Sequence, residues 1–178
     1  MDKERINGED EFKEQGEDYM IPVKVKEIVM DQWQHPLLLL SDLEESLVLP
    51  MGIGFWEAQT IARKWKGEET SRPMTHDLMC NLFQHLEVQV KRIEIHDVYE
   101  NTFYANIYME RNGKEEVVDS RPSDAVALAL TVDTAVYLTE NIRDYTVSMD
   151  ELHIEEVEDE VRGEEGAEED EGEGPWLQ

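Results

Sequence analysis

The segment Ser123-Asp124-Ala125-Val126-Ala127-Leu128-Ala129-Leu130-Thr131-Val132 has the pattern of a helix that is apolar on almost every side. Ser123 is a typical N-cap residue, because its hydroxyl oxygen can accept a hydrogen bond from an unpaired backbone N–H. Asp124 places a negative charge in the first turn, at the positive end of the helix dipole. A helix without a polar face is normally enclosed by other elements. The segment therefore predicts a central, buried helix over residues 125–132.

Strand patterns lie on both sides of this helix. Before it, apolar side chains alternate over residues 103–109, and Asn112-Gly113 is typical of a hairpin turn that leads into a further strand. Further back, the alternation over residues 88–95 changes phase near 91–92, which indicates a β-bulge. After the helix, residues 135–138 predict a last strand.

The earlier part of the chain also begins with strands. Alternating apolar residues start at Val23 and resume on the other phase at Ile28. Apolar runs at 37–40 and 47–49 then flank an acidic turn at 42–45, which predicts a hairpin.

Two helices are expected after this hairpin. Apolar residues at three- and four-residue spacing predict a helix over 55–65. A second helix is expected to follow Thr75, a suitable N-cap, with Asp77 in its first turn. This second helix carries a wide apolar stripe, formed by Leu78, Met79, Leu82, Phe83 and Leu86.

The order is therefore strands, two helices, strands, one helix and a strand. Successive hairpins favour a single compact α+β domain, with about three helices and a strongly bent sheet that is mostly antiparallel or mixed. Both halves run from strands into a helix, one with Glu57-Ala58 and the other with Asp124-Ala125 near its start. An internal duplication would explain this likeness.

The charge of the chain is concentrated at its ends. The 178 residues include 16 Lys+Arg and 43 Asp+Glu, a net charge of −27. Residues 1–20 and 151–178 are rich in acids and poor in apolar anchors, so we expect disordered acidic segments on either side of a domain at 21–150. Between them, residues 21–149 keep 21 acids and 12 bases, a net of −9.

Several classes of protein are disfavoured. The sequence has no run of about 20 apolar residues for a membrane span, and its first residues lack the apolar core of a secretory signal. Its one cysteine, Cys80, cannot form an internal disulfide. We therefore expect a cytoplasmic protein that does not enter a membrane.

The tripeptide Ser-Arg-Pro occurs twice, as Ser71-Arg72-Pro73 and as Ser120-Arg121-Pro122. Each copy precedes a helix that is opened by a hydroxyl residue, Thr75 or Ser123. Unpaired N–H groups at a helix N-terminus and a nearby guanidinium together suit a phosphate. The alternative is that the hydroxyls are only caps and that each arginine pairs with a neighbouring acid.

His76 and several acids near these helix starts could supply chemistry. A neutral histidine can accept a proton from water, and carboxylates can hold a divalent metal ion. Asp77, Asp119, Asp124 and Glu57 would form a carboxylate cluster if the two helix starts converge. The alternative is that His76 is an ordinary surface residue in the first turn of its helix.

Four blocks of this sequence resemble signatures of the bifunctional nuclease domain family. Arg72-Pro73-Met74-Thr75-His76-Asp77-Leu78 is similar to one of them, with Met74 as the departure, and the run from Ser120 to Ala129 is similar to a second. Residues 101–105 and 53–58 resemble two more. The blocks occur in the family's order between about Pro22 and Asn141.

The resemblance implies a self-associating α+β domain, a dimer or trimer, that hydrolyses DNA and RNA. In that interpretation the catalytic residues are His76, which acts as the base, and Asp77, Asp119 and Asp124, which lie near a divalent ion. Asp77, Asp124 and Glu57 are the expected ligands of this Mg²⁺ or Mn²⁺. Arg72, Arg121, Thr75 and Ser123 then bind the substrate.

Two other interpretations remain open from the residues alone. The acidic balance disfavours the approach of a polynucleotide, which favours a non-catalytic domain that binds a small anion or a protein. The acidic C-terminal segment could also compete for the two arginines as a mimic of nucleic acid, or it could only keep the protein soluble.

Overall fold

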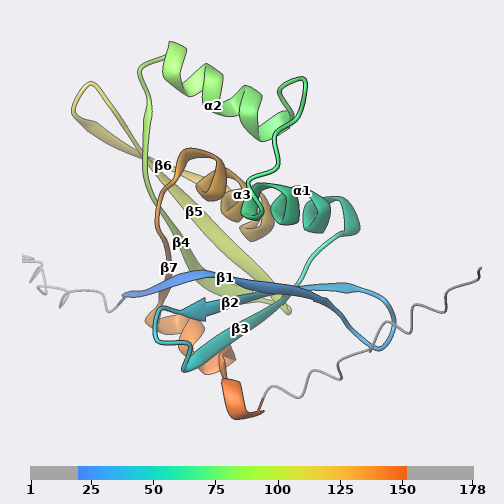
Figure 1. Cartoon of the computed structure of the whole chain (residues 1–178). Helices are drawn as coiled ribbons and strands as arrows, with labels where there is room; N and C mark the ends of the chain where they lie inside the picture. Colours follow the sequence, from blue (N-terminus) through green and yellow to red (C-terminus); the bar gives the residue numbers. More distant parts are fainter. Residues whose placement is uncertain (1–19, 152–178) are drawn as a thin grey trace, which may run out of the picture.

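The computed structural model describes residues 20–151 of the chain. The segments that we expect to be disordered, 1–20 and 151–178, lie outside the described residues except for Met20 and Glu151. Within the described part, eight strands form one mixed sheet in the order β6-β5-β4-β7-β1-β2-β3-β8 (Figure 1). The expected α+β domain with a mostly antiparallel or mixed sheet is confirmed.

The chain builds the sheet in two halves of the same order. The first half is β1 (Met20–Met30), β2 (Pro36–Asp42), β3 (Leu47–Gly52) and helix α1 (Phe55–Trp65). Helix α2 (Thr75–His85) comes between the halves. The second half is β4 (Gln89–Tyr99), β5 (Thr102–Arg111), β6 (Lys114–Ser120) and helix α3 (Pro122–Val132). Each half is thus an antiparallel three-stranded meander followed by a helix.

Strand β7 joins the two meanders, and it is not the last strand as the sequence predicted, because β8 follows it. Strand β7 (Val136–Thr139) lies between β4, to which it is parallel, and β1, to which it is antiparallel. The short elements η1 (Glu140–Tyr145), β8 (Val147–Ser148) and η2 (Met149–Glu151) follow, and β8 pairs with β3. Figure 1 shows β1–β3 crossing the long β4–β5 ladder, which gives the sheet its strong bend.

Local features of the strands follow the sequence patterns. The pairing of β4 with β5 shifts between Val90 and Arg92, and the pairing of β1 with β2 shifts between Val25 and Glu27. These bulges lie where the apolar alternation changes phase. Asn112 and Gly113 both have positive φ, 53° and 73°, as a type I′ hairpin turn requires.

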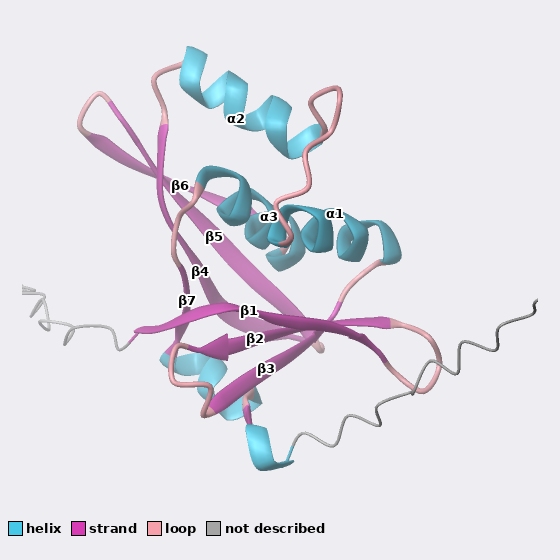
Figure 2. Ribbon diagram, viewed as in Figure 1, coloured by secondary structure: helices cyan, strands magenta, loops and turns pink. Residues whose placement is uncertain are grey.

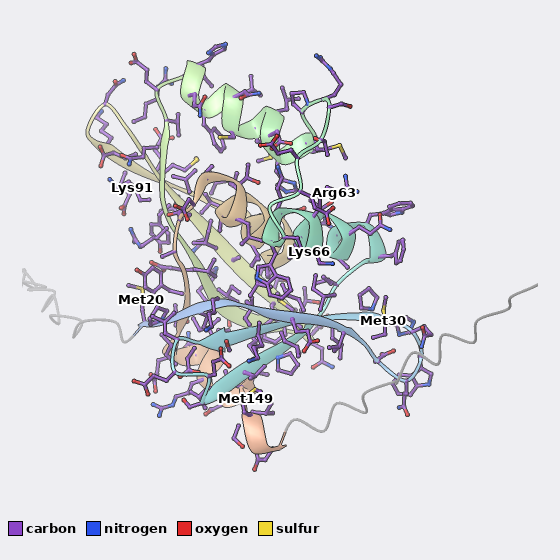
Figure 3. The ribbon with its side chains drawn as sticks, viewed as in Figure 1. Met20, Met30, Arg63, Lys66, Lys91 and Met149 are labelled. Carbon is purple, nitrogen blue, oxygen red and sulfur yellow. The ribbon has the colours of Figure 1, made fainter. Side chains whose placement is uncertain are left out.

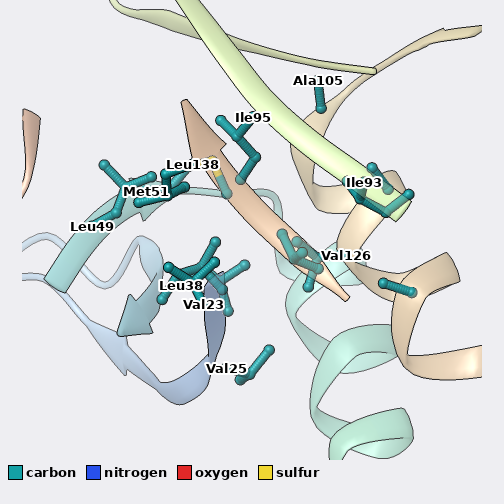
Figure 4. Packing of buried hydrophobic residues seen from close by; sticks show 14 of the residues in the cluster. Val23, Val25, Leu38, Leu49, Met51, Ile93, Ile95, Ala105, Val126 and Leu138 are labelled. Atoms are coloured by element: carbon teal, nitrogen blue, oxygen red, sulfur yellow. The ribbon is translucent and has the colours of Figure 1, made fainter. Parts of the chain in front are cut away.

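Helix α3 is the centre of the fold. It packs against α1, α2, β4 and β5, and its buried residues run from Pro122 to Ala129 with the exception of Asp124. In Figure 2 the three α-helices gather on one side of the bent sheet. Leu38, Leu49, Ile95 and Leu138 from the sheet belong to the same buried cluster as Val126 of this helix, and Figure 4 labels all five. The expectation of a buried central helix is confirmed.

The two expected N-caps are wrong. Helix α3 begins at Pro122 with Arg121 as its N-cap, because the fixed φ of proline suits the first helical position. Ser123 therefore lies inside the first turn. Helix α2 begins at Thr75 itself, and its N-cap Met74 donates its backbone N–H to the Asp77 carboxylate over 2.9 Å. A carboxylate three residues into the helix replaces the expected hydroxyl cap.

Candidate functional site

The first turns of α2 and α3 meet at one cavity, which we call the entrance cavity. Its volume is about 180 Å³. Packing of α3 against both α1 and α2 brings the three helices together here. Ala127 contributes only a methyl group to the wall, which leaves the space open. The lining residues are Trp56, Glu57, Thr60, Met74, Thr75, His76, Ser123, Asp124 and Ala127.

Arg121 is held between two carboxylates beside this cavity. Its Nε donates to Asp124 Oδ2 over 2.7 Å, and its Nη1 donates to Glu57 Oε1 over 3.0 Å. These partners raise the pKa of Arg121, Asp124 most of all, so the guanidinium is a fixed positive charge. The side chain is nevertheless 65% exposed. Since arginine has five N–H donors, some of them can still reach a ligand from solvent.

Gly54 lets Glu57 reach Arg121. A Cβ atom at Gly54 would overlap the Glu57 carboxylate, which folds back over the start of α1. A side chain at this N-cap would require the Glu57 carboxylate to shift, and this carboxylate forms the ion pair with Arg121, 64 residues away in sequence.

His76 lies in the first turn of α2 and is only 9% exposed. Its Nε2 is 4.0 Å from Asp124 Oδ1. Burial lowers the pKa of His76 below 6.5, Asp124 opposes this by favouring the charged ring, and Lys64 adds to the lowering. The imidazole is therefore mainly neutral at pH 7. Among the described residues, its Nδ1 is buried without a hydrogen-bond partner.

Asp77 follows His76 but serves a different purpose. One of its oxygens binds Lys64 of α1, and the other accepts the Met74 N–H. The hydrogen bond from Lys64 is the main reason that the pKa of Asp77 is lowered. The carboxylate ties α1 to the start of α2, and it lines a separate, larger cavity of about 480 Å³ with Lys64.

Two further residues singled out in the sequence lie apart from this arrangement. Asp119 is exposed near the end of β6, opposite Asn106 of β5, and is not part of the cavity wall. Arg72 is exposed in the loop between α1 and α2 and does not line the cavity either. The two Ser-Arg-Pro copies are thus not equivalent. Thr75, Ser123, His76, Asp124 and Glu57, by contrast, do come together.

The carboxylates only partly suit a divalent metal ion. Glu57 and Asp124 face each other across Arg121, so a guanidinium already balances their charge. Asp77 is turned toward Lys64. In the part of the chain from 20 to 151, no three His, Cys, Asp or Glu side chains are grouped as metal ligands. The three-carboxylate set of Asp77, Asp124 and Glu57 is not assembled.

Sequence reasoning did not single out Lys64 or Trp56 as residues of the site. Lys64 is one of several bases near the end of α1, where Figure 3 labels Arg63 and Lys66, and no local pattern distinguishes it. Trp56 lies in the family block at residues 53–58, next to Glu57. Its neighbours along the sequence do not indicate that it belongs to the site. Only the packing of α1 on α3 places it at the cavity.

Fold and site together define a small α+β domain with a histidine, a carboxylate and an arginine at a shared helix entrance. The chain belongs to the bifunctional nuclease domain family, whose family model matches residues 38–160. This confirms the family suggested by the four sequence blocks.

Two curated relatives come from Mycobacterium tuberculosis. The proteins MT1877 of strain CDC 1551 / Oshkosh and Rv1829 of strain H37Rv are each described as uncharacterized. Each is 41% identical to this chain over 121 residues, which cover 67% of the chain and 72% of the relative. The helices described here contain no segment long and apolar enough to cross a membrane.

Proposed function

We propose that this protein hydrolyses phosphodiester bonds of DNA and RNA at the entrance cavity. Membership of the bifunctional nuclease domain family supports the reaction class. The observation that carries the proposal is the grouping of a mainly neutral histidine, a carboxylate 4.0 Å from it and a fixed guanidinium. A base and a positive charge near the phosphate are what attack on a phosphodiester needs.

His76 is the base in the proposed reaction. Its Nε2, the ring nitrogen that lies 4.0 Å from Asp124, accepts a proton from water as the water oxygen forms a bond to phosphorus. The bond from phosphorus to the leaving oxygen breaks, and that oxygen takes up a proton from solvent or from the imidazolium. Asp124, at 4.0 Å, stabilises the positive charge that forms on the ring.

Arg121 binds the phosphate in this proposal. Its exposed N–H groups donate to the non-bridging oxygens, where negative charge accumulates during attack. Glu57 and Asp124 fix the orientation of the guanidinium before the substrate arrives. The Thr75 and Ser123 hydroxyls, on the same cavity wall, are further donors for the substrate.

We propose that the reaction is assisted by Mg²⁺ or Mn²⁺, and the assays below measure this requirement. Glu57 and Asp124 are the two carboxylates at the cavity that could contribute to binding, and Asp77 does not join them.

The second candidate is a domain that binds a small anion or a protein without catalysis. One observation favours it: Arg121 is already neutralised by two carboxylates in a part of the chain whose net charge is −9. Approach of a polynucleotide is then opposed by charge.

Nuclease assays on DNA and RNA test the proposal. Purified wild-type protein should cleave both, with EDTA, Mg²⁺ and Mn²⁺ in separate reactions to define the metal requirement. We expect His76→Ala and Asp124→Asn to lower kcat/KM by roughly 10²- to 10⁴-fold. Cleavage that survives in both variants would show that hydrolysis does not depend on His76 and Asp124. No cleavage by the wild type with any metal would favour the binding domain instead.

Matched pairs of variants sharpen this assay, because the sequence offers two similar residues for each role. Arg121→Gln should lower kcat/KM by roughly 10²-fold or more, while Arg72→Gln should have a much smaller effect. Likewise Asp119→Asn should retain most of the activity that Asp124→Asn loses. Equal losses within a pair would mean that the substrate reaches beyond the entrance cavity.

A further inference from the structure

Trp56 is an exposed aromatic side chain on the wall of the entrance cavity. It is 74% exposed and is the second residue of α1. His76 and Asp124 line the same cavity, and Glu57, the next residue in the chain, orients Arg121. A large indole surface therefore lies directly beside the groups to which we assign hydrolysis.

Among residues 20–151, Phe55 is the one aromatic side chain found in contact with the Trp56 ring. Phe55 packs against it in an edge-to-face contact, with 5.4 Å between the ring centroids and an angle of 77° between the planes. The backbone oxygen of Trp56 accepts a hydrogen bond from Thr60 Oγ1 over 2.9 Å, which steadies this turn of α1. One edge-to-face neighbour leaves area on the indole faces for a flat ligand.

We propose that Trp56 stacks on an unpaired nucleobase and thereby selects single-stranded nucleic acid for the site. This inference rests on the proposed function. A nucleobase within a duplex already stacks on its neighbours, so it cannot stack on a protein ring without leaving the helix. A cavity of about 180 Å³ can accept one flat group. Every base has a π-face, so such binding is tolerant of sequence.

The acidic character of the protein favours this kind of recognition. With a net charge of −9 over residues 21–149, the domain cannot rely on a broad basic surface to attract phosphates. Stacking requires no positive charge and is weakened less by salt than phosphate contacts are. A ring beside one well-placed arginine can therefore bind a nucleotide where a basic groove is absent.

The position of Trp56 suits recognition of a nucleotide as a unit. Glu57 fixes Arg121, the proposed phosphate ligand, while the adjacent Trp56 presents its ring at the same cavity. Trp56 would then hold the base of a nucleotide directly, and Glu57, the next residue of α1, would hold its phosphate indirectly by orienting Arg121. His76 lines the same cavity.

The test measures binding of fluorescently labelled oligo(dT) and oligo(rU) by anisotropy at low ionic strength, with EDTA present. We expect Trp56→Ala to weaken binding by roughly 5- to 150-fold, the effect of losing one stacked base. Trp56→Phe should retain much of the affinity, because it keeps an aromatic face. The matched control is Trp33→Ala, since Trp33 is 69% exposed but lies in the turn between β1 and β2. It should bind as the wild type does.

A parallel measurement uses duplex DNA of mixed sequence. We expect the wild type to bind it more weakly than the single strand, and Trp56→Ala to leave duplex binding nearly unchanged. The thermal midpoint of each variant confirms that the fold is intact, which is expected because both tryptophans are exposed.

The outcomes separate this inference from the proposed function. If the wild type cleaves nucleic acid and Trp56→Ala binds single strands equally well, the stacking role is wrong and hydrolysis stands. If Trp56→Ala loses affinity although no protein cleaves, stacking stands and hydrolysis is wrong. Failure of the wild type to bind any oligonucleotide overturns the inference. So does a Trp56→Ala variant that changes only the oligomeric state, which would place a second copy of the chain on this face.

Discussion

At the scale of single residues, His76 shows how neighbours set the state of a group. Burial favours the neutral ring, Asp124 favours the charged ring and Lys64 again favours the neutral one. The result is a lowered pKa, which keeps the ring able to accept a proton at pH 7. A base that must be unprotonated becomes active as the pH rises through its pKa.

The pH dependence of kcat/KM should report this balance. We expect an acid limb whose midpoint lies below 6.5, the ordinary value for a histidine. Asp124→Asn removes a charge that raises the pKa of His76, so the limb should move to lower pH. Any residual activity of this variant is sufficient for the measurement, because the midpoint of the acid limb is determined independently of the maximal value of kcat/KM.

Lys64→Met provides the opposite control. It removes a positive charge that lowers the pKa of His76 and leaves Asp77, which raises it, unpaired. The limb should therefore move to higher pH. A limb that stays in place in both variants would show that the titrating base is not His76.

At the scale of elements, α2 and α3 differ in how their apolar residues are used. Helix α3 is surrounded, and Leu128 is fully buried. Helix α2 packs through Met79 and Phe83, which lie against the core, while Leu78, Leu82 and Leu86 are about half exposed. The apolar stripe correctly predicted a helix, but only Met79 and Phe83 of its five residues pack against the core.

Stability measurements should distinguish these two environments. Leu128→Ala should lower the free energy of unfolding by about 2–5 kcal/mol, because it leaves a cavity in the core. Leu82→Ala, at a position 48% exposed, should change it by no more than about 0.5 kcal/mol. Denaturant unfolding followed by circular dichroism makes the comparison. A large loss for Leu82→Ala would mean that this face of α2 is covered in solution.

At the scale of the whole molecule, charge is distributed unevenly along the chain. Residues 150–178 contain 14 acids and 1 base, a net charge of −13. Most of this segment lies outside the described residues. Closely spaced carboxylates resemble the charges of a phosphate backbone, and their attachment to the domain keeps their local concentration high.

Deletion of the segment 155–178 tests what this charge does. If it competes for Arg121, the shortened protein should bind and cleave nucleic acid better at low salt. The gain should shrink near physiological ionic strength, where the screening length is about 8 Å. Equal binding and cleavage with and without the segment would assign it to solubility alone. In either case we expect the thermal midpoint to stay nearly unchanged, also after removal of residues 1–19.

The sequence by itself determined the three α-helices, the strands β1 to β7, the fold class and the family, but not the short elements after β7. Period-two alternation, its phase changes and the Asn112-Gly113 turn depend on neighbours along the chain, so they could be interpreted without coordinates. The apolar run of α3 predicted a central helix for the same reason, since a helix with no polar face has to be covered. The family blocks are likewise linear patterns.

Only the tertiary structure decided which polar residues meet. Two Ser-Arg-Pro copies are equivalent as sequence, yet only Arg121 pairs with Glu57, because α1 packs against α3. Asp77 and Asp124 each lie in the first turn of a helix, yet Asp77 forms an ion pair with Lys64 and Asp124 forms one with Arg121. The Lys64–Asp77 and Arg121–Glu57 contacts join residues 13 and 64 positions apart, so they depend on how the helices pack together. No local sequence pattern specifies this packing, which is why the entrance cavity and the place of Trp56 on its wall could be identified only from the tertiary structure.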